Sequence, residues 1–203
     1  MEEQQKYANF SKASYQLYNP LNSKEQNQKN SLKVLTDVGI NDFKLHPSSS
    51  NKRGVYINDN TKEIVISHRG TDTSSKSNLM SDVAIALGFS GSTERFKRAT
   101  RKDAKIKKAF PNHDITLTGH SLGSQIGSQS ATKNDMKGVF YNIGSGVPNL
   151  SSFIKDRRKI NTKIKHYSTP YDPISIQSKK YPITQIQVKT KKGLNPHALE
   201  NFV

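Results

Sequence analysis

Residues 119–123, GHSLG, fit the pattern G-x-S-x-G, which can hold a serine nucleophile for acyl transfer. The pattern is common by chance, so its setting decides its meaning. An apolar, β-branched run at 115–118 precedes it, and a helix-compatible segment begins at Ser121. A nucleophile elbow needs this order of strand, turn and helix, because the serine must lie at a strained turn above a sheet. Gly119 and Gly123 permit the tight turn and the close approach of neighbouring backbone. We therefore expect a catalytic Ser121 rather than an ordinary glycine-rich turn.

A serine nucleophile needs a histidine base, and the base needs a carboxylate that fixes its tautomer. Where such an elbow lies above a parallel sheet, the acid and then the histidine follow the serine along the chain. Only His166 and His197 follow Ser121, and only His197 also follows a plausible acid. The segment around it, GLNPHALENF, is typical of a loop that leads into a helical turn. His197 is the predicted base, and the alternative interpretation is a solvent-exposed histidine.

Three aspartates between the serine and this histidine are candidates for the acid. Asp135 lies on an expected loop, and Asp156 is followed by two arginines, as in a surface ion pair. Asp172 directly follows a strand-like run in the segment PYDPIS. An aspartate before proline is also a common turn former. The position after a strand, with a histidine still to come, favours Asp172 as the acid.

Acyl transfer also requires hydrogen-bond donors for the oxyanion that forms on the substrate. The backbone N–H of Leu122, at the start of the helix after the serine, is one expected donor. The second donor should come from an early loop after a strand, and Thr71 ends such a loop in the run SHRGT. From the residues alone, this run is only a glycine turn.

The order of the expected elements predicts the fold that would position these residues. Strands alternate with helices, which predicts an α/β fold with a mostly parallel central sheet and helices on both faces. We find no repeat and no linker, so 1–203 is expected to be a single domain with a polar loop near 19–32. Strands are expected at 55–57, 63–68, 115–118, 138–146, 163–169 and 183–190. Helices are expected at 2–18, 31–37, 78–87, 93–110, 121–132 and 151–159, with a helical turn at 197–203.

Composition excludes several classes of protein. The 203 residues include no cysteine, which excludes disulfides and thiolate metal sites. No apolar run has the length of a membrane-spanning helix. The first residues, MEEQQKYANF, lack the basic and apolar regions of a secretory signal peptide. We therefore expect a protein that is cytosolic, virion-associated or exported by a non-classical route.

The formal net charge of +16 predicts attraction to polyanions. The run 95–108 alone carries eight basic residues. A solvated helix face is the preferred interpretation of this run, and peripheral contact with an anionic membrane surface is the functional one. Specific nucleic-acid binding is not expected, because the basic runs are not interleaved with aromatic residues and carry no known binding motif.

Taken together, the motifs resemble the class 3, fungal-type lipases of the α/β-hydrolase superfamily. The matching segments, in family order across about residues 53–203, are VISHRGT, NLMSDVAIALG, ITLTGHSLGS, FYNIGSGVP, YDPIS and PHALENF. The resemblance implies Ser121, Asp172 and His197 as the triad, Thr71 and Leu122 as oxyanion donors, and a lid at about 72–81. This chain departs from the family where His68 replaces an aromatic residue and where Ser124 replaces a glycine.

The sequence thus predicts a serine carboxylic-ester hydrolase that acts on lipid esters, as a lipase or phospholipase, through an acyl-enzyme. No metal or organic cofactor is expected. A small-ester esterase or thioesterase is the narrower alternative. The alternative from another class is a catalytically inactive hydrolase fold that serves as a basic membrane-, virion- or nucleic-acid-binding module. The ordered presence of Ser121, Asp172 and His197 favours the enzyme.

Overall fold

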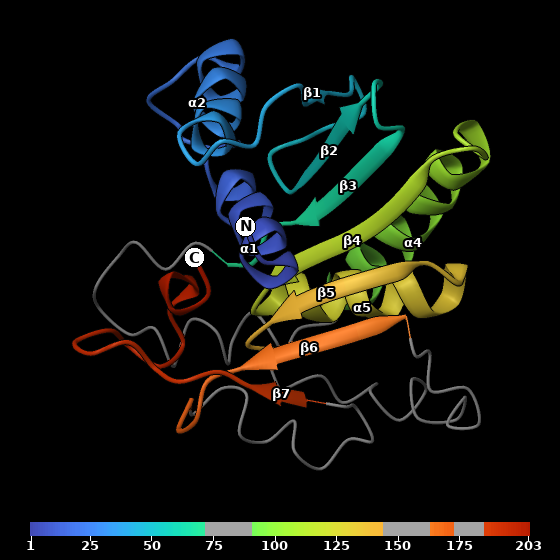
Figure 1. The fold of residues 1–203 in the computed structure, drawn as a ribbon. Coiled ribbons are helices and arrows are strands. Elements are labelled where there is room, and N and C mark those ends of the chain that lie inside the picture. Colours follow the sequence, from blue (N-terminus) through green and yellow to red (C-terminus); the bar gives the residue numbers. More distant parts are fainter. Residues whose placement is uncertain (72–90, 144–162, 173–184) are drawn as a thin grey trace.

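A mixed sheet forms the centre of the molecule, and its strands follow one another in chain order (Figure 1). The computed structural model describes residues 1–71, 91–143, 163–172 and 185–203. The antiparallel part comprises β1 (Lys44–Leu45) and β2 (Arg53–Asn58), with β2 pairing against β3 (Glu63–His68). The parallel part continues from β3 through β4 (Asp114–His120), β5 (Lys137–Tyr141), β6 (Ile164–Ser168) and β7 (Gln185–Gln187). The predicted α/β fold with a mostly parallel sheet is confirmed.

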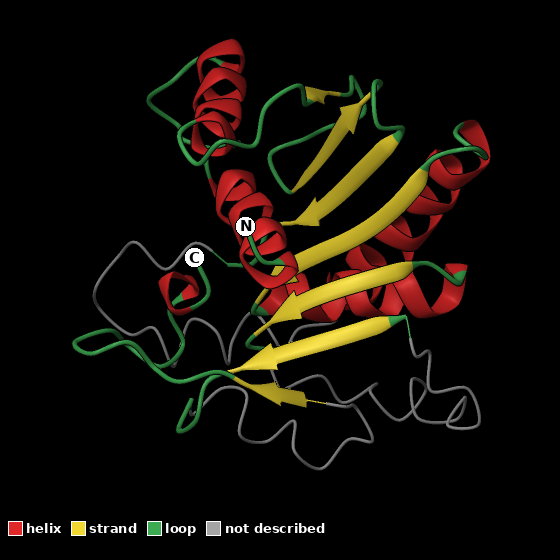
Figure 2. Ribbon diagram, in the orientation of Figure 1, coloured by secondary structure: helices red, strands yellow, loops and turns green. Residues whose placement is uncertain are grey.

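Two layers of helices cover this sheet (Figure 2). The described helices are α1 (Glu3–Tyr15), α2 (Lys24–Thr36), α4 (Gly91–Ala109), α5 (Leu122–Asn134) and a short 3₁₀ turn, η2 (Leu199–Asn201). Most of them agree with the predicted ranges within a few residues. The helices expected at 78–87 and 151–159, the lid at 72–81 and Asp156 lie outside the described residues.

The prediction of a polar loop near 19–32 is wrong for most of that range, because α2 occupies residues 24–36. Ser23 caps the helix, since its Oγ accepts a hydrogen bond from the N–H of Gln26 at 3.1 Å. The buried face of the helix is largely polar and includes Ser31. The Ser31 hydroxyl donates to the carbonyl of Ala13 at 2.8 Å and lies 2.8 Å from the hydroxyl of Tyr56. Polar contacts therefore hold α2 against α1 and β2. The periodic apolar pattern that predicts a helix is weak in this segment.

The strand order explains which elements cover each face. Alternate residues of a strand point to opposite faces. On one face, residues such as Ile64 and Ile66 of β3 form a core with Ile106 of α4 and Ala131 of α5. When neighbouring parallel strands follow one another in chain order, right-handed crossovers place their helices on the same face. The opposite face, which includes Val65, is covered instead by α1 and by residues 199–203.

Candidate active site

The turn between β4 and α5 holds Ser121 in an unusual backbone conformation. Its φ of 57° and ψ of −124° are costly for a residue with a Cβ atom and persist only where the surroundings enforce them. The N–H of Ser121 donates to the carbonyl of Tyr141 on β5 at 3.1 Å. Leu122 is the first residue of α5, so its N–H has no partner within the helix. The geometry is that of a nucleophile elbow.

Both elbow glycines are required by close packing of the turn against β3. A Cβ atom at Gly119 would lie 2.6 Å from the backbone of Gly123, and one at Gly123 would lie 2.1 Å from the carbonyl oxygen of His68. Neither contact leaves room for a side chain. The glycines therefore bring the first turn of α5 against the end of β3.

Ser124, which replaces the glycine that commonly follows the elbow, joins the turn to the next strand. Its hydroxyl lies 2.7 Å from the carbonyl oxygen of Gly119 and 2.6 Å from that of Tyr141. The N–H of Tyr141 donates back to the same hydroxyl at 3.1 Å. The departure from the family pattern thus adds hydrogen bonds that hold the strained turn in place.

His68, the other departure, belongs to a buried charge cluster on the α4 side of the elbow. Its Nε2 lies 2.9 Å from Oδ2 of Asp103, and the same oxygen accepts from Ser130 Oγ at 2.6 Å. The other carboxylate oxygen, Oδ1, accepts from Arg53 Nε at 2.7 Å. Burial would raise the pKa of the Asp103 carboxyl, but His68, Arg53 and Ser130 outweigh burial and hold this pKa below its usual value. The cluster fastens α4 and α5 to the ends of β2 and β3.

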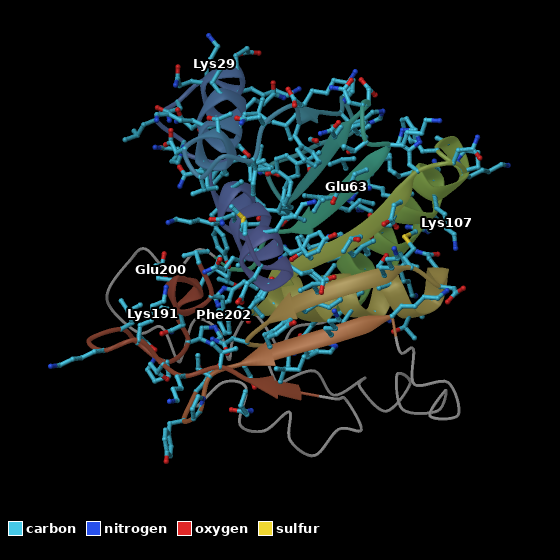
Figure 3. The ribbon with its side chains drawn as sticks, viewed as in Figure 1. Lys29, Glu63, Lys107, Lys191, Glu200 and Phe202 are labelled. Carbon is cyan, nitrogen blue, oxygen red and sulfur yellow. The ribbon has the colours of Figure 1, made fainter. Side chains whose placement is uncertain are left out.

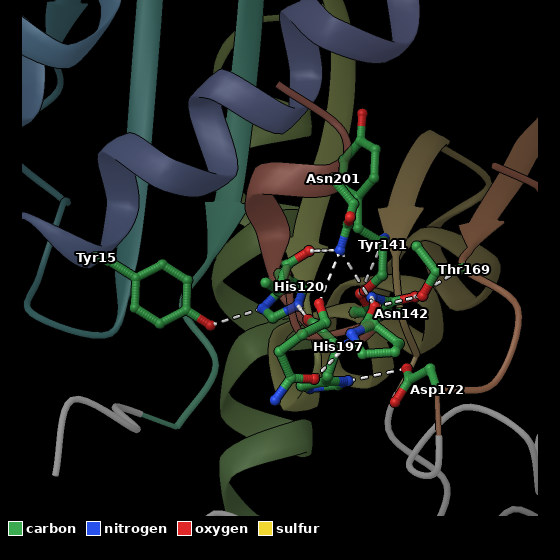
Figure 4. Close-up of polar contacts among 12 residues, drawn as sticks. Tyr15, His120, Tyr141, Asn142, Thr169, Asp172, His197 and Asn201 are labelled. Atoms are coloured by element: carbon green, nitrogen blue, oxygen red, sulfur yellow. Dashed lines mark hydrogen bonds and ion pairs between the residues drawn. The ribbon is translucent and has the colours of Figure 1, made fainter. Parts of the chain in front are cut away.

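The structure brings Asp172 and His197 together at the carboxyl edge of the sheet (Figure 4). The Nδ1 of His197 lies 2.9 Å from Oδ2 of Asp172, and both side chains are buried. Because the carboxylate only accepts, Nδ1 carries a proton, and in the neutral form of this tautomer Nε2 presents a lone pair. The Nε2 atom is buried and has no hydrogen-bond partner among the described residues. It is therefore available to take a proton from a group in the adjoining cavity.

His120, the second residue of the elbow, holds the backbone of His197. Its Nε2 lies 2.7 Å from the carbonyl oxygen of His197, which only accepts, so Nε2 carries the proton. Its Nδ1 then accepts from the hydroxyl of Tyr15 on α1, at 3.1 Å. Burial, followed by the nearby His197, lowers the pKa of His120 to about 3, so this imidazole is neutral. Sequence reasoning did not predict this contact.

Two asparagines fix the rest of the loop that carries His197. Asn142, in the left-handed region with φ 41°, donates to the carbonyl of Pro196 at 3.0 Å. Asn201 donates to the carbonyls of Asn195 and Ala198, each at 2.9 Å. Sequence reasoning missed both asparagines. The available signal was an asparagine directly after a buried strand, in FYNIG, and another near the histidine, in HALEN.

A cavity of about 340 Å³ lies at this edge of the sheet, and polar and apolar atoms both line it. Ser121, His197 and Thr71 all line it, so three of the predicted site residues meet there, while Asp172 lies behind His197. The full lining comprises Lys12, Tyr15, Gln16, Thr71, His120, Ser121, Asn195, His197, Ala198, Leu199 and Glu200. The contribution of α1 to this wall was not predicted.

Two further properties concern only the described residues. They contain no group of three or more histidine and acidic side chains placed to hold a metal ion. None of their helices is both long enough and apolar enough to cross a membrane.

Comparison with known families identifies the chain. Residues 6–200 match the phospholipase-like family described as the Tle-like phospholipase domain. The chain belongs to this family. Membership supports hydrolysis of lipid esters as the general activity. The chain matches no curated protein sequence at a significant level.

Solved structures similar to this member of the family are fungal lipases. Lip2 lipase from Yarrowia lipolytica is 15% identical with a TM-score of 0.57, over 97% of this chain and 80% of that one. The lipase from Rhizopus microsporus var. chinensis is 15% identical with a TM-score of 0.59, over 92% and 73%. The mono- and diacylglycerol lipase from Aspergillus oryzae is 16% identical with a TM-score of 0.54, over 100% and 85%. At these identities the comparison concerns the fold, and it confirms the resemblance to fungal class 3 lipases.

Proposed function

We propose that this protein hydrolyses carboxylic esters of lipids, phospholipids among them, through Ser121, His197 and Asp172. The observation that carries the proposal is the convergence of two independent features on one cavity. One is the strained Ser121 at the tip of β4, and the other is His197, which is oriented by Asp172 and whose Nε2 has no hydrogen-bond partner among the described residues. A strained serine and a carboxylate-oriented histidine that line the same cavity are the groups that acyl transfer needs.

In the acylation step, Nε2 of His197 removes the proton of Ser121 as its Oγ attacks the ester carbonyl. Asp172 stabilises the imidazolium that forms and keeps the ring in the required tautomer. The N–H groups of Leu122 and Thr71 donate to the oxyanion, and mutation of one such donor in other enzymes costs about 10²–10³ in rate. The alcohol then leaves with the proton carried by Nε2.

In the deacylation step, water takes the place of the alcohol. His197 removes a proton from water, and the resulting attack breaks the bond between the acyl group and Ser121. Atoms and charges balance without a cofactor, because the proton returns to Ser121 at the end of the cycle.

The cavity wall favours a substrate with a polar head group. Lys12, Gln16 and Glu200 contribute polar or charged groups beside the serine. A neutral triglyceride would leave these groups without partners, whereas a phosphodiester or an alcohol can bind them. This supports phospholipids, in agreement with the family's name, over neutral fat.

The test is hydrolysis of p-nitrophenyl esters and of phospholipid vesicles by the wild type and by Ser121→Ala. Ser128→Ala, a few residues further along α5, is the matched control because its hydroxyl faces His166 rather than the cavity. We expect Ser121→Ala and His197→Ala to lose activity and Ser128→Ala to keep it. A fluorophosphonate should add its mass to Ser121 in the wild type and in Ser128→Ala, and should not label Ser121→Ala. Absence of hydrolysis by the wild type on every ester would refute the proposal and favour an inactive fold.

A further inference from the structure

The loops that carry Asp172 and His197 leave the sheet side by side. β6 and β7 are parallel neighbours, and the N–H of Val188 donates to the carbonyl of Ser168 at 2.8 Å. Further out, the hydroxyl of Thr169 donates to the carbonyl of Pro196. Segments 169–172 and 188–196 therefore form one surface at the carboxyl edge of the sheet (Figure 1). We refer to it as the carboxyl-edge surface.

Two apolar side chains project from this surface into solvent. Tyr171 is 84% exposed and occupies the left-handed region with φ 63°, although the next residue, Asp172, is almost completely buried. Leu194 is 36% exposed and lies beside Asn195, which lines the cavity. Single exposed apolar residues are normal on proteins, so their surroundings decide their meaning.

Three lysines lie on segment 188–196 of this surface. Lys189, Lys191 and Lys192 are exposed, and none has an acidic partner among the described residues. Lys191 lies on the same side of the molecule as Glu200 (Figure 3), which is the one acidic residue of segment 185–203. A turn closed by the N–H of Leu194 on the carbonyl of Lys191 holds the lysines and the leucine together. The surface is thus positively charged with an apolar and aromatic tip.

The basic face of α4 is the competing surface for a polyanion. Lys97, Arg98, Lys102 and Lys105 point outward there. α4 packs on the face of the sheet opposite to α1, and none of its residues lines the cavity. A bilayer bound to α4 would therefore not face the cavity, whereas a bilayer bound to the carboxyl-edge surface would.

We propose that the carboxyl-edge surface docks on an anionic lipid bilayer. Lys189 and Lys192 lie over lipid phosphates, where each such cation is attracted by the negative surface potential of the leaflet. Tyr171 and Leu194 enter the headgroup layer, which suits the amphipathic ring of tyrosine. Docking this way brings the cavity to its substrate, a consequence that rests on the proposed function. Binding itself does not depend on catalysis.

A tryptophan reporter tests which surface meets the lipid, because the chain contains no tryptophan. Leu194→Trp places the reporter on the carboxyl-edge surface, and Lys105→Trp places it on the outer face of α4. Both proteins are mixed with vesicles of equal parts phosphatidylglycerol and phosphatidylcholine. We expect a blue-shifted emission, quenched by brominated lipid, for Leu194→Trp alone. A shift for Lys105→Trp alone, or for neither protein, would overturn the proposal.

Matched charge removals provide a second, quantitative measurement. The pair Lys189→Gln and Lys192→Gln should weaken partition onto these vesicles about 30-fold, given roughly 1 kcal/mol per lysine near the surface. Lys191 is left intact because its ammonium donates to the carbonyl of Val203. The pair Lys97→Gln and Lys102→Gln removes the same charge and should change partition less than about threefold, because charges beyond a Debye length are screened. Equal losses in the two pairs would contradict the proposal.

A water-soluble ester separates this proposal from the proposed function. Both double variants should hydrolyse it at the wild-type rate, and only the carboxyl-edge pair should lose activity on vesicles. If the wild type hydrolyses no ester, the proposed function fails while the partition and fluorescence results still decide the docking. If the wild type hydrolyses the water-soluble ester but does not bind vesicles, the docking proposal is refuted and the proposed function stands.

Discussion

The hydrogen bond from His120 to the backbone of His197 can be tested by two substitutions. Each substitution keeps one of the two hydrogen bonds that the His120 ring makes. The amide nitrogen of His120→Gln can occupy the place of Nε2 and donate to the His197 carbonyl, as the imidazole does at 2.7 Å. The shorter side chain of His120→Asn reaches only as far as Nδ1, so it keeps the contact with Tyr15 and loses the one with His197. The two variants differ by one methylene group.

The structure sets the size of the expected effect. In His120→Asn the buried carbonyl of His197 loses its donor, which costs about 1–3 kcal/mol if the loop stays in place. If the loop moves instead, a displacement of about 1 Å at a catalytic group costs roughly 10²-fold in rate. We therefore expect kcat to fall about 10- to 100-fold in His120→Asn. His120→Gln should stay within about fivefold of the wild type, because its hydrogen bond is retained.

The assay is kcat and KM on a water-soluble ester, with urea unfolding of each variant as a check on folding. KM should change little, because His120 positions the base and does not hold the substrate. Since the pKa of His120 is about 3, its own protonation does not change between about pH 5 and 9. The ratio of the two variants' rates should therefore be constant over that range. Equal losses in both variants, or an unimpaired His120→Asn, would refute the positioning role.

Three further predictions concern stability. Burial lowers the pKa of His166 to about 3 from 6.5, so the unfolded chain binds the additional proton below pH 6.5. The free energy of unfolding should then fall by ~1.4 kcal/mol per pH unit from this histidine as pH drops towards 3, and His166→Phe should remove that component in urea titrations. Asp103→Asn should destabilise the protein by about 3–5 kcal/mol, because it leaves the buried Arg53 guanidinium without its carboxylate, whereas Asp114→Asn, which removes an exposed ion pair with Lys137, should cost about 0–1 kcal/mol. Gly123→Ala should prevent folding of the elbow, seen as loss of soluble protein or of activity, because its Cβ would lie 2.1 Å from the carbonyl oxygen of His68.

Local pattern was sufficient to predict the strand, turn and helix around Ser121 and a mostly parallel sheet. The β-branched run before Ser121 and the two glycines determine a strand and a turn without help from distant residues. Chain order, together with the position of Asp172 directly after a strand, then selected Asp172 and His197, which are hydrogen-bonded in the structure. Their catalytic roles remain predictions.

Contacts between distant segments could not be predicted in the same way. His120 and His197 are 77 positions apart, and nothing near either residue indicates that a side chain binds the other's carbonyl. Asn142 reaches Pro196 across 54 positions. Residues 24–30 of α2, which precede the helix predicted at 31–37, were missed for a related reason, since the buried face of α2 is largely polar and its partners, such as Tyr56, lie elsewhere in the chain.

The strands of the sheet follow one another in chain order, and this arrangement has a consequence for how such a hydrolase can diversify. α4 and α5 are crossovers, so their face is built into the path of the chain. α1 and residues 195–203, which supply much of the cavity wall, pack on the other face without connecting two neighbouring parallel strands. Exchange of α1 with Tyr15 retained can therefore alter the cavity wall while the elbow and its charge cluster stay untouched, whereas exchange of residues 195–203 would also replace His197. Substrate preference that depends on α1 can thus be engineered separately from the reaction chemistry.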